Sequence, residues 1–290
     1  MAATAPVVVE LAALMQPGDG GPTATAAADK LVGSLRARGY ALLRAPPAGK
    51  AVLTDYCASI TRFYNGDDAA KAAALRDCGH AVEYKCGGDA GARAIASRRE
   101  ILTYTRSGEA EGGCGCECRA DRERGALEGS CEAVMELCRG AALLALRAVA
   151  DSLRVERALL EETLDPAELP LGGRGHDTLN AFKYHREKTA DAESQVAVAL
   201  DVHYDMNLLT VQLPNSEHMG LQLLDTRRAA AAASGGSGGP AWVDVERWVG
   251  AFDLLLFAGA PLHRLTAGFI PACCHRSAIC ITAATHVEPP

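Results

Sequence analysis

The spacing of apolar positions changes near residue 172, and this change divides the predicted structure in two. Before it, apolar residues recur at helical intervals, which predicts helices over residues 28–38, 51–64, 69–75, 131–153 and 156–163. After it come short apolar runs separated by turn residues, which predict strands over residues 179–184, 195–202, 208–213, 220–224, 242–245, 253–257 and 277–284. We therefore expect a helical N-terminal part and a strand-rich C-terminal part.

Local signals refine the N-terminal part. Gly39 can end the first helix, and the apolar residues 40–43 after it form a short strand. Residues 79–129 are rich in glycine and charge, so we expect loops there, with one strand over residues 100–104. Ser130 is expected to cap the long helix that follows, because a serine hydroxyl can accept a hydrogen bond from a free backbone N–H there.

The many short, closely spaced strands after residue 172 suggest a β-sandwich or a barrel. Residues 229–240 contain almost only Ala, Gly and Ser, which is typical of a flexible loop within a hairpin. We expect an α+β chain that is mainly β, organised as residues 1–129, residues 130–170 and residues 171–290.

Composition and charge exclude several classes of partner. The 290 residues carry a net charge of −7, which argues against binding to nucleic acid or to an acidic membrane surface. No apolar run approaches the roughly 18 residues of a membrane span. The N-terminus lacks the basic segment of a secretory signal, so we expect a cytoplasmic protein, with its oligomeric state left open.

Eleven cysteines are an odd number, which favours reduced thiols over a disulfide framework. The densest group is Cys114, Cys116 and Cys118. One interpretation is a glycine-rich loop with incidental thiols; the other is a soft-metal or redox site. The one-residue spacing weakens the second, because zinc sites usually separate paired cysteines by two to four residues.

A candidate metal site begins at His203. The sequence His203-Tyr204-Asp205 follows the apolar run 196–200. If the strand continues, alternation turns the first and third of these side chains to the same face. An imidazole and a carboxylate together supply two of the three ligands of the 2-His-1-carboxylate triad of Fe(II) oxygenases. His263 and His275 are the two candidates for the third ligand.

The order of five sequence blocks makes this site more specific. The blocks are residues 203–210 (HYDMNLLT), 220–223 (GLQL), 242–245 (WVDV), 257–268 (FAGAPLHRLTAG) and 274–276 (CHR). In this order they resemble the isopenicillin-N-synthase-like family of 2-oxoglutarate- and Fe(II)-dependent dioxygenases. The likeness extends more weakly upstream, to the helix and strand over residues 31–43 and to the helix from Cys131.

The resemblance implies a fold and an activity. It implies a double-stranded β-helix, or jelly roll, over residues 171–290, bracing helices over 130–170 and a dioxygenase-like N-terminal region over 1–129. His203, Asp205 and His275 would bind Fe(II). The enzyme would use dioxygen to hydroxylate or otherwise oxidise a small organic substrate, while 2-oxoglutarate is decarboxylated to succinate.

The sequence departs from the family at the residue that binds the far carboxylate of 2-oxoglutarate. The family uses Arg-x-Ser about one hairpin after the distal histidine, whereas Arg276 and Ser277 follow His275 directly and no arginine comes later. Either His275 binds iron and the arginine-bearing hairpin is shortened, or His263 binds iron and Arg276 and Ser277 lie one hairpin later, at the usual separation. We favour the first, and we keep Arg276 and Ser277 as candidate contacts of the cosubstrate.

Tyr184 is a further candidate for contact with the cosubstrate, because residues 179–184 resemble a strand of the family that carries such a tyrosine. A packed strand aromatic is the alternative role of Tyr184. The missing arginine also leaves two alternative functions open. One is a catalytically impaired protein with the oxygenase fold; the other is an iron oxidase that does not use 2-oxoglutarate.

Overall fold

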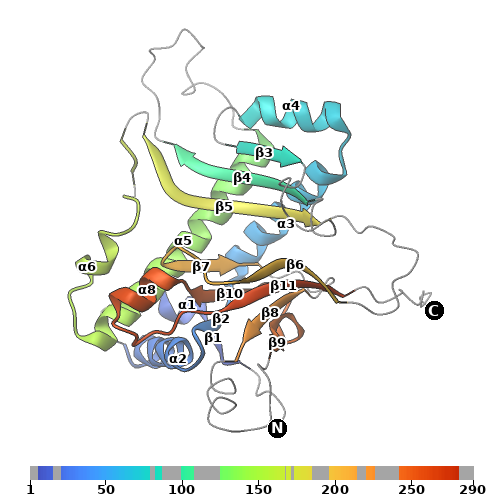
Figure 1. Ribbon diagram of the computed structural model, residues 1–290. Coiled ribbons are helices and arrows are strands. Elements are labelled where there is room, and N and C mark those ends of the chain that lie inside the picture. Colours follow the sequence, from blue (N-terminus) through green and yellow to red (C-terminus); the bar gives the residue numbers. More distant parts are fainter. Residues whose placement is uncertain are drawn as a thin grey trace.

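A computed structural model describes most of the chain as three β-sheets packed with helices (Figure 1). The residues it describes are 6–15, 21–78, 82–86, 99–107, 125–166, 168–170, 173–184, 196–213, 220–225 and 242–280. The cysteine group at residues 114–118 lies outside these ranges.

The first sheet has the order β1-β2-β10-β7. In that order its strands are Val8–Glu10, Tyr40–Arg44, Asp253–Ala258 and Leu209–Gln212. Every residue of β10 is buried, and β10 pairs antiparallel with both β2 and β7. A strand covered on both faces needs apolar residues on both, which explains the unbroken run Leu254–Phe257.

The second sheet has the order β6-β11-β8-β9, with all neighbours antiparallel. In that order its strands are Val196–His203, His275–Cys280, Leu221–Leu224 and Trp242–Asp244. Leu221 and Leu223 are buried while the residues between and after them are partly exposed, as expected for a strand with one covered face. Irregular register between β11 and β6 lies next to His275.

The third sheet has the order β3-β4-β5, formed by Val82–Cys86, Arg99–Ser107 and Arg174–Tyr184. β4 was predicted as a strand, but β3 lies in a segment predicted to be loops. The register pairs Val82 with Tyr104, which places two buried side chains opposite each other. Burial against the neighbouring strand, rather than local propensity, therefore explains β3.

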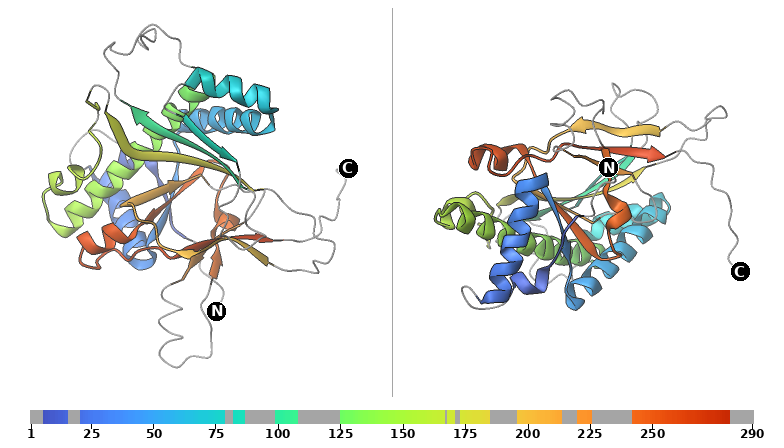
Figure 2. Two further views of the ribbon diagram at one scale, coloured as in Figure 1. Left: turned by 45° about the horizontal axis from the view of Figure 1, so that its top comes forward. Right: turned by 90° about the horizontal axis from the view of Figure 1, so that it is seen from below.

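The long helix α5 crosses behind the first and third sheets (Figures 1 and 2). The helices are α1 Leu11–Leu14, α2 Pro22–Arg38, α3 Pro47–Asn65, α4 Asp68–Cys78, α5 Ala126–Leu153, α6 Ala158–Glu161 and α8 Ala260–Leu265, with a 3-10 helix at Val245–Trp248. The 28-residue α5 contacts α2, α3, β4, β5 and β7. It thus connects the first sheet to the third.

Three expectations about these elements are wrong. The described residues contain more helix than strand, so the chain is mixed rather than mainly β. α5 begins at Ala126, and Ser130 is not its cap: its hydroxyl donates to the carbonyl of Ala126 at 2.7 Å, and it lies 2.8 Å from the hydroxyl of Ser59. Finally, α8 forms in a segment for which no helix was expected.

Strands from the predicted N-terminal region pair with strands of the predicted C-terminal region. β2 pairs with β10, and β4 pairs with β5. None of the helices within the described ranges is both long enough and apolar enough to span a membrane.

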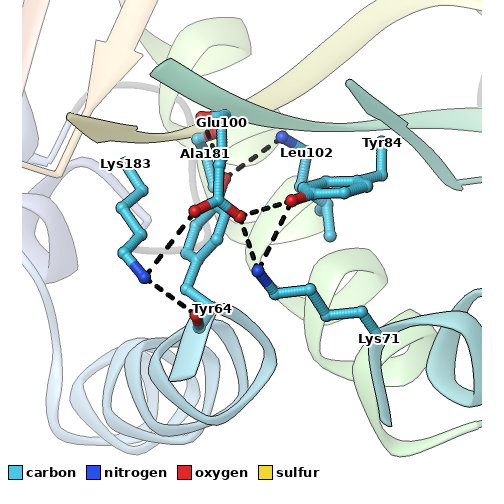
Figure 3. A network of polar contacts seen from close by, with 7 residues as sticks. All are labelled: Tyr64, Lys71, Tyr84, Glu100, Leu102, Ala181 and Lys183. Atoms are coloured by element: carbon cyan, nitrogen blue, oxygen red, sulfur yellow. Dashed lines mark hydrogen bonds and ion pairs between the residues drawn. The ribbon is translucent and has the colours of Figure 1, made fainter. Parts of the chain in front are cut away.

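A buried carboxylate fastens the third sheet to α3 and α4 (Figure 3). Glu100 lies 2.7 Å from the Lys71 ammonium and 3.7 Å from that of Lys183, and the Tyr84 hydroxyl donates to the same carboxylate. The Tyr64 hydroxyl donates to the carbonyl of Ala181 at 2.6 Å. These contacts join two helices to all three strands of the sheet, so one buried charge is compensated by several elements at once.

The Glu100 contacts predict a large loss of stability on Glu100→Ala. The change would leave two lysines without their carboxylate; the Lys71 side chain is only 12% exposed. Breaking a buried pair in this way costs about 3–5 kcal/mol. Urea unfolding measures the loss. Glu83→Ala on β3 is the control, because its ion pair with Arg174 is half exposed and is expected to contribute at most about 1 kcal/mol. Equal losses in the two variants would contradict a buried anchor.

Candidate metal centre

Two strands of the second sheet bring the predicted histidines together. His203 is the last residue of β6 and His275 is the first residue of β11, and they are direct partners in the antiparallel register. Their ring centroids are 4.1 Å apart. Side chains opposite each other on antiparallel strands share a face, so the pairing itself places both imidazoles on one side of the sheet.

Asp205 completes the group from the turn that follows β6. Its Oδ1 lies 3.5 Å from Nε2 of His203 and 3.6 Å from Nε2 of His275. One ligand atom from each residue lies within 4.8 Å of the others, and in the described part of the chain no other such group of potential ligands occurs. His275 is buried, whereas His203 and Asp205 are half-buried, so the group opens toward solvent on one side.

Backbone carbonyls orient both imidazoles. Nδ1 of His203 lies 2.7 Å from the carbonyl of Asp201, and Nδ1 of His275 lies 3.2 Å from that of Cys273. A carbonyl can only accept, so Nδ1 carries the proton in each neutral ring and Nε2 keeps its lone pair. Burial lowers the pKa of His275, which favours this neutral form. Both Nε2 atoms face Asp205, as ligands of a single ion would.

The turn that carries Asp205 rests against Gly259, the residue after β10. The Gly259 N–H donates to the carbonyl of Leu208 at 3.0 Å, and the Ala260 N–H donates to that of Asp205 at 2.8 Å. A Cβ at residue 259 would overlap with the carbonyl oxygen of Asn207 and lie 2.9 Å from that of Asp205. Glycine is required here by close backbone approach, since its φ of −83° is open to any residue.

The first sheet also supports His275 directly. The ring of Phe257, on β10, lies 4.8 Å from the ring of His275, centroid to centroid. Phe257 is fully buried among Tyr40, Leu42 and Leu223. The imidazole therefore packs against a rigid apolar surface, which restricts its rotation.

The other candidate for the third ligand lies elsewhere. His263 is an exposed residue of α8, and its Nδ1 lies 3.0 Å from the carbonyl of Ile270. It does not belong to the group of three. The structure thus brings His275, and not His263, to the pair formed by His203 and Asp205.

Arg276 lies on the opposite face of the second sheet from His275. In the register of β8 and β11, His275 pairs with the buried Leu223, whereas Arg276 pairs with Gln222. The Arg276 Nε donates to Oε1 of Gln222 at 2.7 Å, and its guanidinium stacks over Trp242 at 4.3 Å from the ring centroid. The irregular register of β11 with β6 next to His275 does not turn both side chains to the same face. In this arrangement Arg276 does not reach the three-residue group, contrary to the cosubstrate contact considered above.

Ser277 and Tyr184 are the two remaining candidates for contact with the cosubstrate, and the structure gives less information about them. Ser277 pairs with the buried Leu221, so it lies on the same face of β11 as His275. Tyr184 ends β5, where it pairs with Arg99, and its side chain lies outside what the structure describes. Sequence reasoning did not single out Phe257 or Gly259, although both fall within one of the five blocks.

Comparisons with known proteins identify the fold. No protein-family model and no curated protein matches the sequence. A protein assigned to the 2OG-Fe(II) oxygenase family from Caulobacter crescentus matches with a TM-score of 0.64 and 18% identity, over 95% of this chain and 80% of that chain. A full-length Neurospora crassa protein in complex with alpha-KG matches with a TM-score of 0.64 and 14% identity, over 95% and 80%. JOX2 in complex with 2OG, Fe and JA matches with a TM-score of 0.59 and 13% identity, over 95% and 71%. At these identities the likeness shows that the chain has the fold of 2OG-Fe(II) oxygenases.

The contact at Gly259 predicts that Gly259→Ala destabilises the protein. The added methyl group would force the turn at Asp205 away from β10, and overpacking of this kind costs about 1–3 kcal/mol. Gly140→Ala is the matched control, because residue 140 is an exposed helical position where a Cβ meets no atom within 4 Å. The control should gain about 0.5–1 kcal/mol from helix propensity. Thermal and urea unfolding compare the two, and a stabilised Gly259→Ala variant would contradict the close contact.

Proposed function

We propose that this protein is an Fe(II)- and 2-oxoglutarate-dependent oxygenase of the isopenicillin-N-synthase-like family. The observation that carries the proposal is the convergence of His203, Asp205 and His275 within a fold shared with 2OG-Fe(II) oxygenases. Two imidazoles and one carboxylate are the ligand set that suits ferrous iron in such enzymes. The two four-stranded sheets are proposed to be the two halves of the jelly roll.

The residues present fit a ferrous ion. Both histidines direct Nε2 toward Asp205, whose charge would offset half of that of the ion. Iron bound there would supply the means to activate dioxygen with electrons from the cosubstrate. The protein's part is to hold three ligands on one side and keep the other side open for cosubstrate and substrate.

The proposed substrate is a small organic molecule. The similar structures include the Neurospora crassa protein in complex with thymine and JOX2 in complex with JA. These ligands differ in chemistry, so the fold does not restrict the substrate further. The proposal therefore names the reaction class, in which a small molecule is hydroxylated or otherwise oxidised while 2-oxoglutarate is converted to succinate.

Metal and cosubstrate binding test the proposal directly. The protein loaded anaerobically with Fe(II) and 2-oxoglutarate should show the visible absorption band of the chelate, and in air with ascorbate it should form succinate. His203→Ala and Asp205→Ala should lose both signals, because each removes one of three ligands. His263→Ala is the control and should keep both, since its side chain lies outside the group. Loss of both signals in His263→Ala, with both kept in His275→Ala, would assign the third ligand to His263.

A second candidate is an iron-dependent oxidase, or a catalytically impaired relative, that does not use 2-oxoglutarate. The position of Arg276 favours it, because that side chain is engaged with Gln222 and Trp242 on the far face of the sheet. Under this alternative the wild-type protein binds Fe(II) but shows neither the chelate band nor succinate.

The Arg276→Met variant tests whether this arginine binds 2-oxoglutarate or only packs against Gln222 and Trp242. Methionine keeps apolar contact with Trp242 but lacks the guanidinium. Because the guanidinium is held away from the three-residue group, we expect the affinity for 2-oxoglutarate to change by less than about twofold, well below the loss of a charge-assisted hydrogen bond. Titration of the chelate band measures the affinity. A loss of about tenfold or more in a variant that still folds would show that Arg276 turns inward to bind the cosubstrate.

A further inference from the structure

We propose that Thr210 is a positioning residue that reserves a single oxygen of Asp205 for the metal. This inference rests on the proposed iron site. Oδ1 of Asp205 faces both imidazoles, at 3.5 Å and 3.6 Å from their Nε2 atoms. The other oxygen, Oδ2, accepts a hydrogen bond from the Thr210 hydroxyl. The two oxygens of the carboxylate therefore have different partners.

Thr210 reaches Asp205 from the other sheet. It belongs to β7, in the first sheet, whereas the three proposed ligands belong to the second sheet or to the turn after β6. Its direct partner across the strands is Phe257 of β10, which packs on His275. One cross-strand pair thus contacts two of the three proposed ligands. As a β-branched residue on a strand, Thr210 has few side-chain conformations, so its hydroxyl is well placed before any ion binds.

The side chain of Asn207 is placed to orient the Thr210 hydroxyl toward Asp205. The side-chain oxygen of Asn207 lies 3.1 Å from Oγ1 of Thr210. The hydroxyl has one hydrogen, which Asp205 receives, so Asn207 must act as the donor. A half-turn of its amide, whose O and N atoms are interchangeable in shape, puts an N–H at that position. The chain of hydrogen bonds then runs from Asn207 through Thr210 to Oδ2 of Asp205.

The way Asp205 binds determines how many coordination positions of the metal the protein occupies. A carboxylate that binds through one oxygen leaves half of an octahedral coordination sphere free beside two imidazoles. A carboxylate that binds through both oxygens takes one of those positions away, and a bidentate cosubstrate plus dioxygen would then lack room. By engaging Oδ2, Thr210 keeps Asp205 in the one-oxygen mode and fixes the direction of Oδ1.

Thr210→Val and Thr210→Ser test this role with Co(II) as the probe. Valine matches threonine in shape and in β-branching but cannot donate, whereas serine keeps the hydroxyl. We expect Thr210→Val to weaken Co(II) binding about 10- to 100-fold and to change the visible Co(II) spectrum, because the carboxylate is no longer held. Thr210→Ser should restore the wild-type spectrum. Calorimetry measures the affinity, and thermal unfolding of the metal-free proteins checks that each variant folds.

Two results would overturn the inference. One is a folded Thr210→Val variant with the Co(II) affinity and spectrum of the wild type. The other is an equal loss in the valine and serine variants, which would indicate a packing role. Wild-type protein that binds no Co(II) would instead overturn the proposed metal site itself, so the two failures are distinguishable.

Asn207→Ala provides a test that does not depend on how the valine variant folds, because Asn207 is exposed. Its loss should weaken Co(II) binding in the same direction but to a smaller extent than Thr210→Val, since the hydroxyl remains. An unchanged affinity would overturn the part assigned to Asn207.

Discussion

The fully buried strand β10 is the element on which the rest of the structure depends. It lies between β2 and β7, and its alternate residues enter two different apolar clusters: Leu254, Leu256 and Ala258 enter the larger one, and Leu255 and Phe257 enter the smaller. Apolar burial on both faces makes this strand costly to displace. Residues that contact the end of β10 are therefore held in fixed positions.

The candidate metal centre uses that fixed position. The second sheet supplies both histidines through the pairing of β6 with β11, and the first sheet supplies the groups that hold the ligands still. Phe257 packs on one imidazole, and Gly259 holds the turn that carries the carboxylate. The ligands and their supports thus come from opposite sheets. The site can form only when the sheets face each other, which couples its geometry to the whole fold rather than to one loop.

Much of this arrangement could be predicted from the sequence, and the failures have specific causes. Helical periodicity predicted α3 and α5 within about five residues, and a short apolar run predicted β10. The ordered blocks predicted that His203, Asp205 and His275 would meet. β3 was missed because pairing with β4, not its own sequence, makes it a strand. Adjacent strand residues such as His275 and Arg276 face opposite sides, and the observed stacking of Arg276 on Trp242 agrees with this alternation. The role of Gly259 could not be predicted, because it depends on a close backbone approach between residues far apart along the sequence.

The opposite orientation of His275 and Arg276 has a consequence for how this protein can vary during evolution. Strand residues change face at every step, so one inserted or deleted residue between Cys274 and Ser277 would exchange an imidazole for a guanidinium on the inner face. Substitutions at neighbouring positions could be tolerated one at a time, but a change of chain length there could not. Homologues that keep the three ligands should therefore show a gap-free alignment across this segment, even where few of its residues are identical.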